Sequence, residues 1–174
     1  MAILEILTLP EPALKQESSP VTEFDDALRA FIADLEETRV NGPAAVGIAA
    51  PQVGYFKRVV VLDCSTTRKP VPNHGRLVLV NPEITHWEGY EPGREGCLSV
   101  PDYTGNVIRA TRIHLVAQDP YGERLEFDME GYEARAAQHE IDHLDGILFV
   151  DRVVSRRTDL FKRKVYQKGG GKAS

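Results

Sequence analysis

Cysteine is scarce in this sequence, since its 174 residues contain only Cys64 and Cys97. A secreted scaffold built on disulfides needs many more, so that class of protein is excluded and a reducing cytoplasm is the expected location. Each cysteine must then be interpreted by itself. Cys64 directly follows the β-branched run 58–63, and a lone cysteine at such a place is usually a small buried hydrophobic residue.

Long apolar runs are also lacking, and none approaches the ~20 residues needed to cross a bilayer. The first residues include Glu5 and lack both the basic patch and the cleavage site of a secretory signal. We therefore expect a soluble protein with no membrane partner. The length fits one domain over residues 1–168, and the glycine-rich end at 169–174 is expected to be disordered.

Positive charge is concentrated at one end of a chain whose net charge is −5. Residues 152–174 hold eight Lys and Arg against one acid, Asp159. A solvated helix with a frayed end is one interpretation of this basic tail. A contact with nucleic acid is the other, because phosphate contacts depend mainly on charge.

The pattern of predicted elements, together with the histidine motif and the family resemblance described below, leads us to expect an α+β protein of antiparallel strands around a central metal-binding helix, with N- and C-terminal helices. Helical spacing, including capping-box spacing from Thr22 to Asp25, predicts helices at 23–39 and 132–144 and a shorter one at 156–167. β-branched runs predict strands at 58–63, 76–85, 112–118 and 124–129. The stretch 46–54 has neither period but is dense in small residues, so a ligand can approach its backbone closely.

The most informative segment is QHEIDH at 138–143. Histidines four apart on a helix, here His139 and His143, lie on one face and are able to share a metal ion. Glu140 follows the first histidine and is placed to act as a general base without being a ligand. Buried histidines with a purely structural role are the alternative. It is weakened because the two histidines lie away from the apolar stripe that contains Ala137 and Ile141.

A catalytic centre needs a third protein ligand and an open position. Cys97 follows a glycine and precedes an apolar residue, where a strand edge could present its thiolate to the helix. His74 lies in a polar loop, while His86 and His114 lie in strand-like segments without evident partners. These three histidines are expected to be ordinary residues.

Three ordered motifs resemble the peptide deformylase family: VGIAAPQ at 46–52, EGCLS at 95–99 and QHEIDHLDG at 138–146. Weaker similarity extends from the segment near Pro10 to FVDR at 149–152. The resemblance implies a hydrolase that removes the formyl group from the N-terminal formyl-methionine of nascent polypeptides and releases formate.

The resemblance also implies roles for individual residues. The expected metal ligands are Cys97, His139 and His143, and the expected catalytic groups are Glu140, Gln52 and the backbone N–H of Leu98. The expected substrate-binding residues are Gly47, Ile48, Glu95, Gly96, Arg135 and Ala136. The implied cofactor is one divalent ion, Fe²⁺ physiologically, with Zn²⁺ or Ni²⁺ as substitutes in preparations. Glu95 is expected to pair with Arg109 and brace the strand that ends at Cys97, and a surface role for Arg109 is the alternative.

The implied partners are N-formylmethionyl nascent peptides, and the basic tail is a candidate ribosome contact. Two residues depart from the family pattern. Ala45 stands where glycine is common, and Arg135 makes the helix less apolar than in some members. Both put the shape of the methionine pocket in question, and neither changes the chemistry.

Two other functions compete with this interpretation. A metallopeptidase that cuts internal peptide bonds would use the same glutamate, but generally takes its third ligand from His or Glu downstream of the pair. A structural metal site would usually close the fourth position with another Cys or His, and no second cysteine neighbours Cys97. Cys97 therefore favours the deformylase interpretation.

Overall fold

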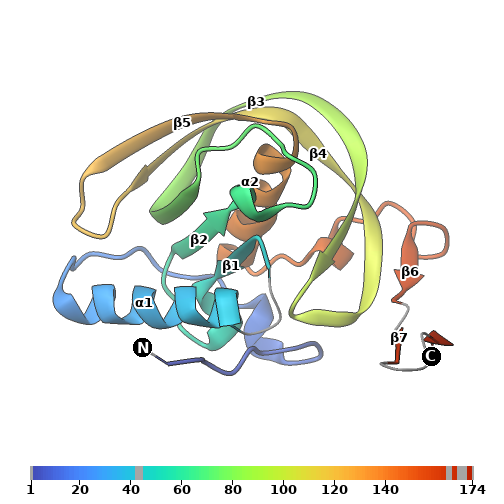
Figure 1. Cartoon of the computed structure of the whole chain (residues 1–174), viewed down its shortest axis with the longest axis horizontal. Coiled ribbons are helices and arrows are strands. Elements are labelled where there is room, and N and C mark those ends of the chain that lie inside the picture. The colour runs from blue at the N-terminus through green and yellow to red at the C-terminus, as the bar shows by residue number, and fades with distance from the viewer. Residues whose placement is uncertain (1, 42–44, 164–165, 168–171, 174) are drawn as a thin grey trace.

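The computed structural model describes residues 2–41, 45–163, 166–167 and 172–173. An antiparallel sheet curves around the helix α2, and the helix α1 lies outside it (Figure 1). The sheet order is β1-β2-β3-β4-β5, and β6 pairs with β4. Its strands are β1 (Gly47–Ala49), β2 (Val59–Asp63), β3 (Arg76–Cys97), β4 (Val100–Gln118), β5 (Arg124–Glu130) and β6 (Leu160–Lys162).

The α-helices of the described residues are α1 (Asp26–Asn41) and α2 (Gly131–Leu144), which confirms an α+β fold with an antiparallel sheet. Short 3-10 turns cover η1 (Pro12–Lys15), η2 (Ala50–Val53), η3 (Cys64–Thr66) and η4 (Phe149–Asp151). A separate pair joins β7 (Tyr166–Gln167) to β8 (Lys172–Ala173). Neither α-helix is long and apolar enough to span a bilayer.

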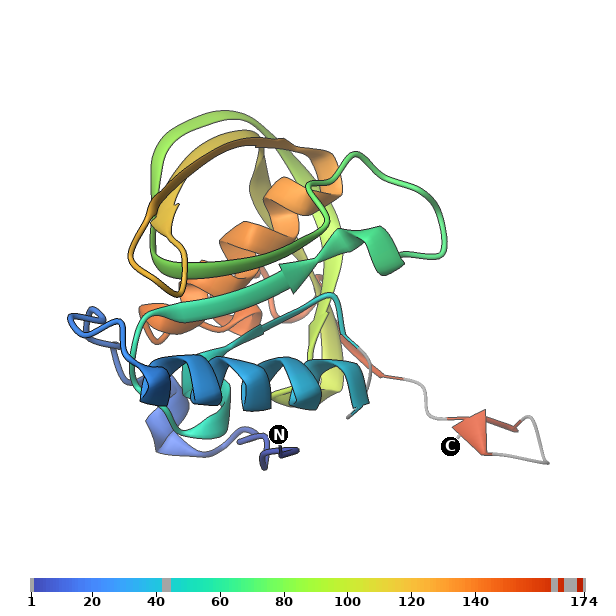
Figure 2. The ribbon, with the colours of Figure 1, turned by 60° about the vertical axis from the view of Figure 1, so that its left-hand side comes forward.

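The short strands β1 and β2 lie between the two helices (Figure 2). Side chains of successive strand residues point to opposite faces. Val59 and Val61 pack in the cluster that contains Ile32 of α1, whereas Val60 and Leu62 pack with residues of α2. Burial on both faces explains why this strand is an unbroken apolar run.

The helix α1 begins three residues later than the sequence predicted. Asp25 Oδ1 accepts a hydrogen bond from the backbone N–H of Leu28 at 2.9 Å, so Asp25 rather than Thr22 caps the helix. Leu28, Ile32 and Leu35 are buried against the sheet. Their spacing is the one that predicted this helix.

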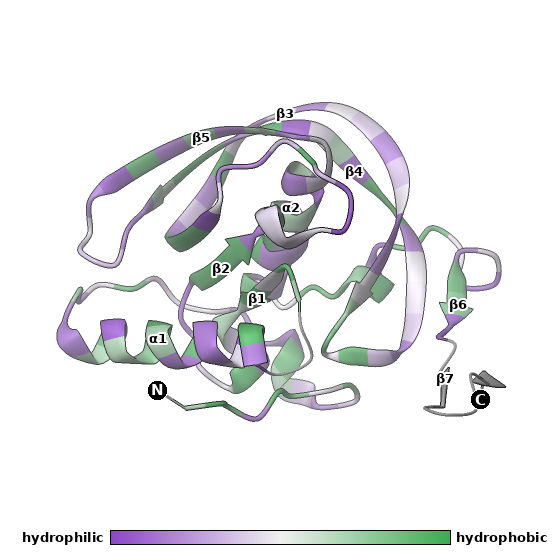
Figure 3. Cartoon of the chain, viewed as in Figure 1, coloured by the Kyte–Doolittle hydropathy of each residue, from purple (hydrophilic) through white to green (hydrophobic). Residues whose placement is uncertain are grey.

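The helix α2 is enclosed because β3, β4 and β5 arch over it (Figure 1). Nearly all its residues are buried, including polar ones such as Gln138, His139 and Glu140. Hydrophilic and hydrophobic residues alternate along β5, which directs one side of that strand to the core and the other to solvent (Figure 3). The hairpin of β3 and β4 turns at Leu98 and Ser99, directly after Cys97.

The predicted C-terminal helix at 156–167 is wrong over the residues described there. Residues 156–159 form a turn, and Leu160–Lys162 form β6. The reason is a tertiary partner: the edge of β4 at Tyr103–Gly105 offers unpaired backbone groups, and Leu160 packs on the cluster that contains Phe149. The predicted disordered end at 169–174 lies outside the described residues, apart from Lys172–Ala173.

Candidate active site

Three side chains from two elements meet at the centre of the molecule. His139 and His143 lie one turn apart on α2, and Cys97 is the last residue of β3. Their donor atoms all lie within 4.8 Å of one another, and this is the single such group found in the part of the chain that the structure describes. Cys97 Sγ lies 3.3 Å from His143 Nε2. The ligands expected from the sequence therefore form a possible metal-binding site.

The donor set fits a divalent transition metal. A thiolate and two imidazoles suit zinc and other borderline ions, and three protein donors leave a position open, as in catalytic sites. His139 Nδ1 donates a hydrogen bond of 2.9 Å to Glu95 Oε1, which leaves the other ring nitrogen available to a metal. This bond fixes the tautomer and the orientation of the ring.

Glu95 is the centre of a buried ionic network. Arg109 donates to both of its carboxylate oxygens at 2.9 Å, as expected, and Arg135 donates at 2.7 Å. Burial alone would raise the pKa of Glu95, but the bonds from Arg109 and His139 hold that pKa well below its ordinary value. Glu95 therefore stays ionised and connects β3 to β4 and α2.

The two histidines have opposite pKa shifts without a metal. Burial opposes the charged ring of His139, yet the adjoining Cys97 and Glu95 raise its pKa well above the ordinary value. Burial and the neighbouring charge of His139 lower the pKa of His143. A metal needs both rings neutral, so its binding would displace a proton from this centre.

Glu140 is buried beside the histidines, and its Oε1 atom has no hydrogen-bond partner among the described residues. Its carboxylate lies against the backbone of Gly47, where a Cβ atom would be only 2.8 Å from Oε2. Burial raises the pKa of Glu140 to about 7. An unpaired buried carboxyl of this pKa is suited to exchanging a proton with a molecule in the adjoining cavity.

Gln52 is presented by η2, on the opposite side of Cys97 from α2. Its Oε1 accepts from the backbone N–H of Ala49 at 2.9 Å, and its Nε2 donates to Ser99 Oγ at 3.1 Å. Nε2 also lies 3.6 Å from Cys97 Sγ. The two bonds orient the amide so that its N–H groups face the cysteine.

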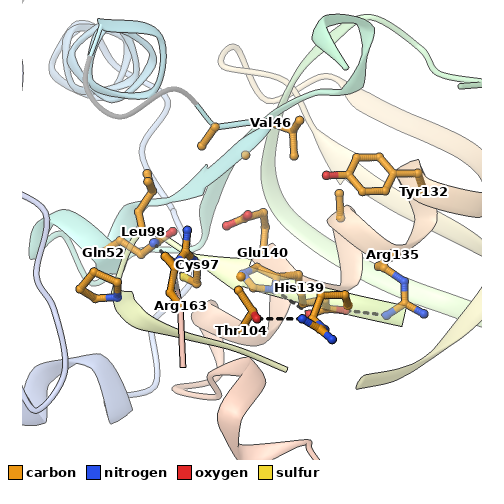
Figure 4. Close-up of a pocket in the computed structure, with 17 residues that line it drawn as sticks. Val46, Gln52, Cys97, Leu98, Thr104, Tyr132, Arg135, His139, Glu140 and Arg163 are labelled. Atoms are coloured by element: carbon orange, nitrogen blue, oxygen red, sulfur yellow. Dashed lines mark hydrogen bonds and ion pairs between the residues drawn. The ribbon is translucent and has the colours of Figure 1, made fainter. Parts of the chain in front are cut away.

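A cavity of about 630 Å³ opens next to these groups (Figure 4). Most of the residues expected from the sequence line it: Gly47, Gln52, Glu95, Gly96, Cys97, Leu98, Arg135, Ala136, His139 and Glu140. The side chain of Ile48 is instead fully buried in the cluster under α1, and His143 lies behind the cavity wall. Only the backbone of Ile48 is therefore available to a substrate.

The sequence interpretation missed several residues. Asp142, inside the histidine motif, accepts from both Arg109 and Arg152. The side chain of Gln138 bonds both backbone groups of Ala110 and so attaches α2 to β4. Their places next to the histidines were the available signal, because polar residues on a buried helix need partners.

Four further predictions concern isolated residues. His86 and His114 were expected to lack partners, which is wrong: His86 Nε2 lies 3.4 Å from Glu88 Oε2, and His114 Nδ1 lies 2.7 Å from Asp128 Oδ1. His74, in its loop, has Nδ1 2.6 Å from Glu133 Oε1. None of the three histidines joins the candidate ligand group. Cys64 is fully buried as predicted, and burial raises the pKa of its thiol to about 12. It is an inert core residue.

Comparison with known proteins identifies the family to which this chain belongs. The family model described as polypeptide deformylase matches residues 3–159. The chain belongs to this family. It is 44% identical over 165 residues to a peptide deformylase of Acidobacterium capsulatum, with 95% of each chain covered. A peptide deformylase of Thermodesulfovibrio yellowstonii is 42% identical over 164 residues, which cover 94% of this chain and 97% of the relative.

Solved structures agree with the sequence relatives. The peptide deformylase of Thermotoga maritima superposes with a TM-score of 0.81 at 36% identity, covering 89% of this chain and 100% of that one. A peptide deformylase from Acinetobacter baumannii also gives a TM-score of 0.81 at 36% identity, with coverage of 87% and 99%. The chain is accordingly a hydrolase that removes the formyl group from nascent peptides.

Proposed function

We propose that deformylation takes place at Cys97, His139 and His143, with Glu140 as the group that moves the proton. The observation that carries the proposal is the unpaired Oε1 of Glu140, a buried atom of a residue that lines the cavity beside the candidate ligands. When bound, a divalent ion would supply a Lewis acid and acidify water at this place. On this proposal, α2 would be the central metal-binding helix expected from the sequence.

Glu140 would work in both directions. As its carboxylate it takes the proton from the attacking water, and as its carboxylic acid it returns that proton to the nitrogen that leaves as the free N-terminus. A pKa near 7 before a metal binds makes both forms accessible. The contact with Gly47 limits where the carboxylate can lie, which would keep it close to the attacking water.

The negative charge that develops on the formyl oxygen needs hydrogen-bond donors. The amide of Gln52 is held by Ala49 and Ser99 on the Cys97 side of the cavity, and the N–H of Leu98 belongs to the adjoining turn. Donors that are oriented before the reaction stabilise such charge best, and the loss of one typically costs about 3 kcal/mol of barrier.

The peptide would lie along β1. This strand pairs only with β2 within the described sheet, so the other edge of Gly47–Ala49 is able to bond an extended chain whatever its side chains. The methionine side chain would enter the cavity beside Tyr132, Arg135 and Ala136. The Acinetobacter baumannii relative was solved with Met-Ala-Ser bound, which is the peptide that deformylation of formyl-Met-Ala-Ser leaves.

Anaerobic release of formate from formyl-Met-Ala-Ser, with metal content measured on the same sample, tests this proposal. One formate and one free N-terminus per peptide are expected, with no cleavage of internal bonds. Fully loaded protein that releases no formate would refute it.

We infer iron(II) as the working ion, although ligand chemistry and the general affinity order favour zinc. The ion that binds most tightly need not be the most active one if turnover requires five ligands around the metal, because iron(II) accepts five ligands readily. One apo preparation should be loaded in parallel with either ion. Iron is expected to give kcat/KM at least about 10-fold higher. Equal activity at full occupancy would remove the dependence on iron.

We further propose that the basic tail, residues 152–174, contacts ribosomal RNA in the cytoplasm, where nascent chains emerge. Of its charges, Arg152 is already paired with Asp142, whereas Lys162 and Arg163 are exposed. Co-sedimentation with ribosomes should weaken with salt and after deletion of residues 162–174, which removes both exposed charges. Unchanged co-sedimentation in both tests would exclude the contact.

A further inference from the structure

The cavity is lined by more arginine side chains than the proposed reaction requires. Three arginines line it: Arg94, Arg135 and Arg163. Arg135 is neutralised by Glu95 at 2.7 Å. Arg94 instead donates to the neutral side chains of Asn106 and Thr104, and Arg163 forms no ion pair with any residue that the structure describes. Two guanidinium groups at the mouth are therefore available to an incoming anion.

The segment that replaces the predicted C-terminal helix brings Arg163 to this place. β6 pairs with Tyr103–Gly105 of β4, and the backbone N–H of Arg163 donates to the Asp102 carbonyl at 2.7 Å. Both contacts attach the segment to the strand that follows the Cys97 turn. Arg163 is thus held next to the site from a position far along the chain.

Gly96 leaves the space that the Arg163 side chain occupies. A Cβ atom at Gly96 would lie 2.6 Å from Arg163 Nη2, so the guanidinium rests on the glycine backbone directly before Cys97. Figure 4 shows Arg163 beside Cys97, on the side of the cavity away from Tyr132. The methionine side chain and Arg163 would therefore occupy different parts of the cavity.

Arg94, on β3, lines the same cavity and is held in place by residues of β4 and β6. Its guanidinium lies 3.8 Å from the centre of the Phe161 ring, and Phe161 pairs in register with Thr104, which Arg94 also bonds. Stacking on an aromatic ring and two neutral hydrogen bonds orient the group but leave its charge unmatched. The strand β6 thus positions both arginines at once.

We propose that Arg94 and Arg163 form a carboxylate-binding subsite, so that the enzyme favours formyl peptides with Asp or Glu at the second or third residue. The inference rests on the proposed function, because the formyl group at the metal centre places those residues at the cavity mouth. A guanidinium group binds a carboxylate through two parallel hydrogen bonds. A neutral or basic side chain of the peptide does not offer this pair of charged acceptors.

The test compares C-terminally amidated formyl-Met-Ala-Glu-Ser with its Gln and Lys counterparts, and repeats the series with the changed residue in second place. Amidation removes the terminal carboxylate as a competing ligand. At low salt, kcat/KM for the better Glu peptide should exceed that for its Gln counterpart by roughly threefold per arginine, through KM rather than kcat. The preference should shrink in about 0.5 M salt, because exposed charges are screened.

Variants assign the preference to residues. Arg163→Gln and Arg94→Gln should each lower the Glu-to-Gln ratio, the double variant should bring it to about one, and Arg163→Lys should keep part of it. Lys162→Gln is the matched control: it removes the same charge one residue earlier in β6, from an exposed side chain outside the cavity lining, and should leave the ratio unchanged.

A ratio of one in active wild-type enzyme at both positions, or a ratio insensitive to both arginine substitutions, would overturn the subsite and leave the proposed function intact. Affinities of the deformylated Met-Ala-Glu-Ser and Met-Ala-Gln-Ser amides for the zinc-loaded protein, measured by calorimetry, provide a readout without turnover. Tighter binding of the Glu product that is lost in the double variant would support the subsite even if no formate were released.

Discussion

At the scale of single residues, the site depends on where two carboxylates are held. Glu95 accepts hydrogen bonds from Arg109, Arg135 and His139, whereas Glu140 has a buried oxygen without a partner among the described residues. Both side chains are buried, so the difference between their pKa values comes from their hydrogen-bond partners and neighbouring charges. Glu95 has its pKa held low, stays ionised and positions the ring of His139, while Glu140 is able to change its protonation state.

Glu140→Gln keeps the shape of this side chain but removes its basicity. We expect turnover to fall by a factor of about 10² to 10⁴, because one group would serve as base and acid. Metal content should stay near that of the wild type. His139→Ala is the contrasting variant, which should lose the metal. Near-normal formate release by the Gln variant would take Glu140 out of the mechanism.

Glu95→Gln should make the free energy of unfolding less dependent on pH in the acid range. A carboxyl whose pKa is lowered by folding contributes stability above its unfolded pKa of about 4.3, and that stability is lost as pH falls toward the folded pKa. In metal-free protein at about pH 7, the variant should be about 3 kcal/mol less stable, because a buried ion pair is broken. Urea unfolding from about pH 7 to about pH 3 should show this difference shrinking. A constant difference would contradict the assignment.

At the scale of elements, the end of α2 is determined by a close backbone approach. Gly146 has φ 73°, and a Cβ atom there would lie 2.3 Å from the Lys15 carbonyl oxygen. Ser18 N–H also donates to the Leu144 carbonyl at 2.8 Å. The segment after η1 therefore packs on the last turn of the helix that carries the two histidines.

Gly146→Ala tests this packing, and Gly75→Ala is its matched control. Gly75 has φ 76°, but no atom lies within 4 Å of the place that a Cβ would take, so its substitution costs only backbone strain, about 1 kcal/mol. Gly146→Ala adds overpacking and should cost roughly 2 kcal/mol more. Denaturant unfolding of both variants measures the difference. Equal losses would show that the Lys15 contact adds nothing.

At the scale of the whole molecule, the candidate metal site connects the sheet to the central helix. Cys97 belongs to the β3–β4 hairpin and both histidines belong to α2. An ion held by all three would bind the folded chain and not the unfolded one. Metal binding and global stability are therefore expected to be coupled.

Removing the metal should lower the melting temperature, with a loss of about 2.7 kcal/mol when free metal had been about 100-fold above its Kd. Calorimetry of metal-loaded and chelator-treated protein measures the shift. Cys97→Ala should abolish the shift, because one of three ligands is lost. A shift of equal size in that variant would place the metal elsewhere.

Local patterns account for the parts of the fold that were predictable. Leu28, Ile32 and Leu35 repeat at helical intervals and form the buried face of α1. The strand β2 is apolar throughout because both its faces are covered. The helix predicted at 156–167 failed because strand pairing with β4 outweighs a weak helical pattern, and that partner lies far away in the chain.

The sequence by itself determined the residue types of the candidate site: histidines one helical turn apart, a glutamate beside the first, and a cysteine available as a third ligand. Those features depend on spacing and residue type. Only the tertiary structure decided that Cys97 meets the histidines, that Glu140 is left without a partner among the described residues, and that Arg163 reaches the cavity mouth. Such features need contacts between distant segments, which chain packing creates and local periodicity does not contain.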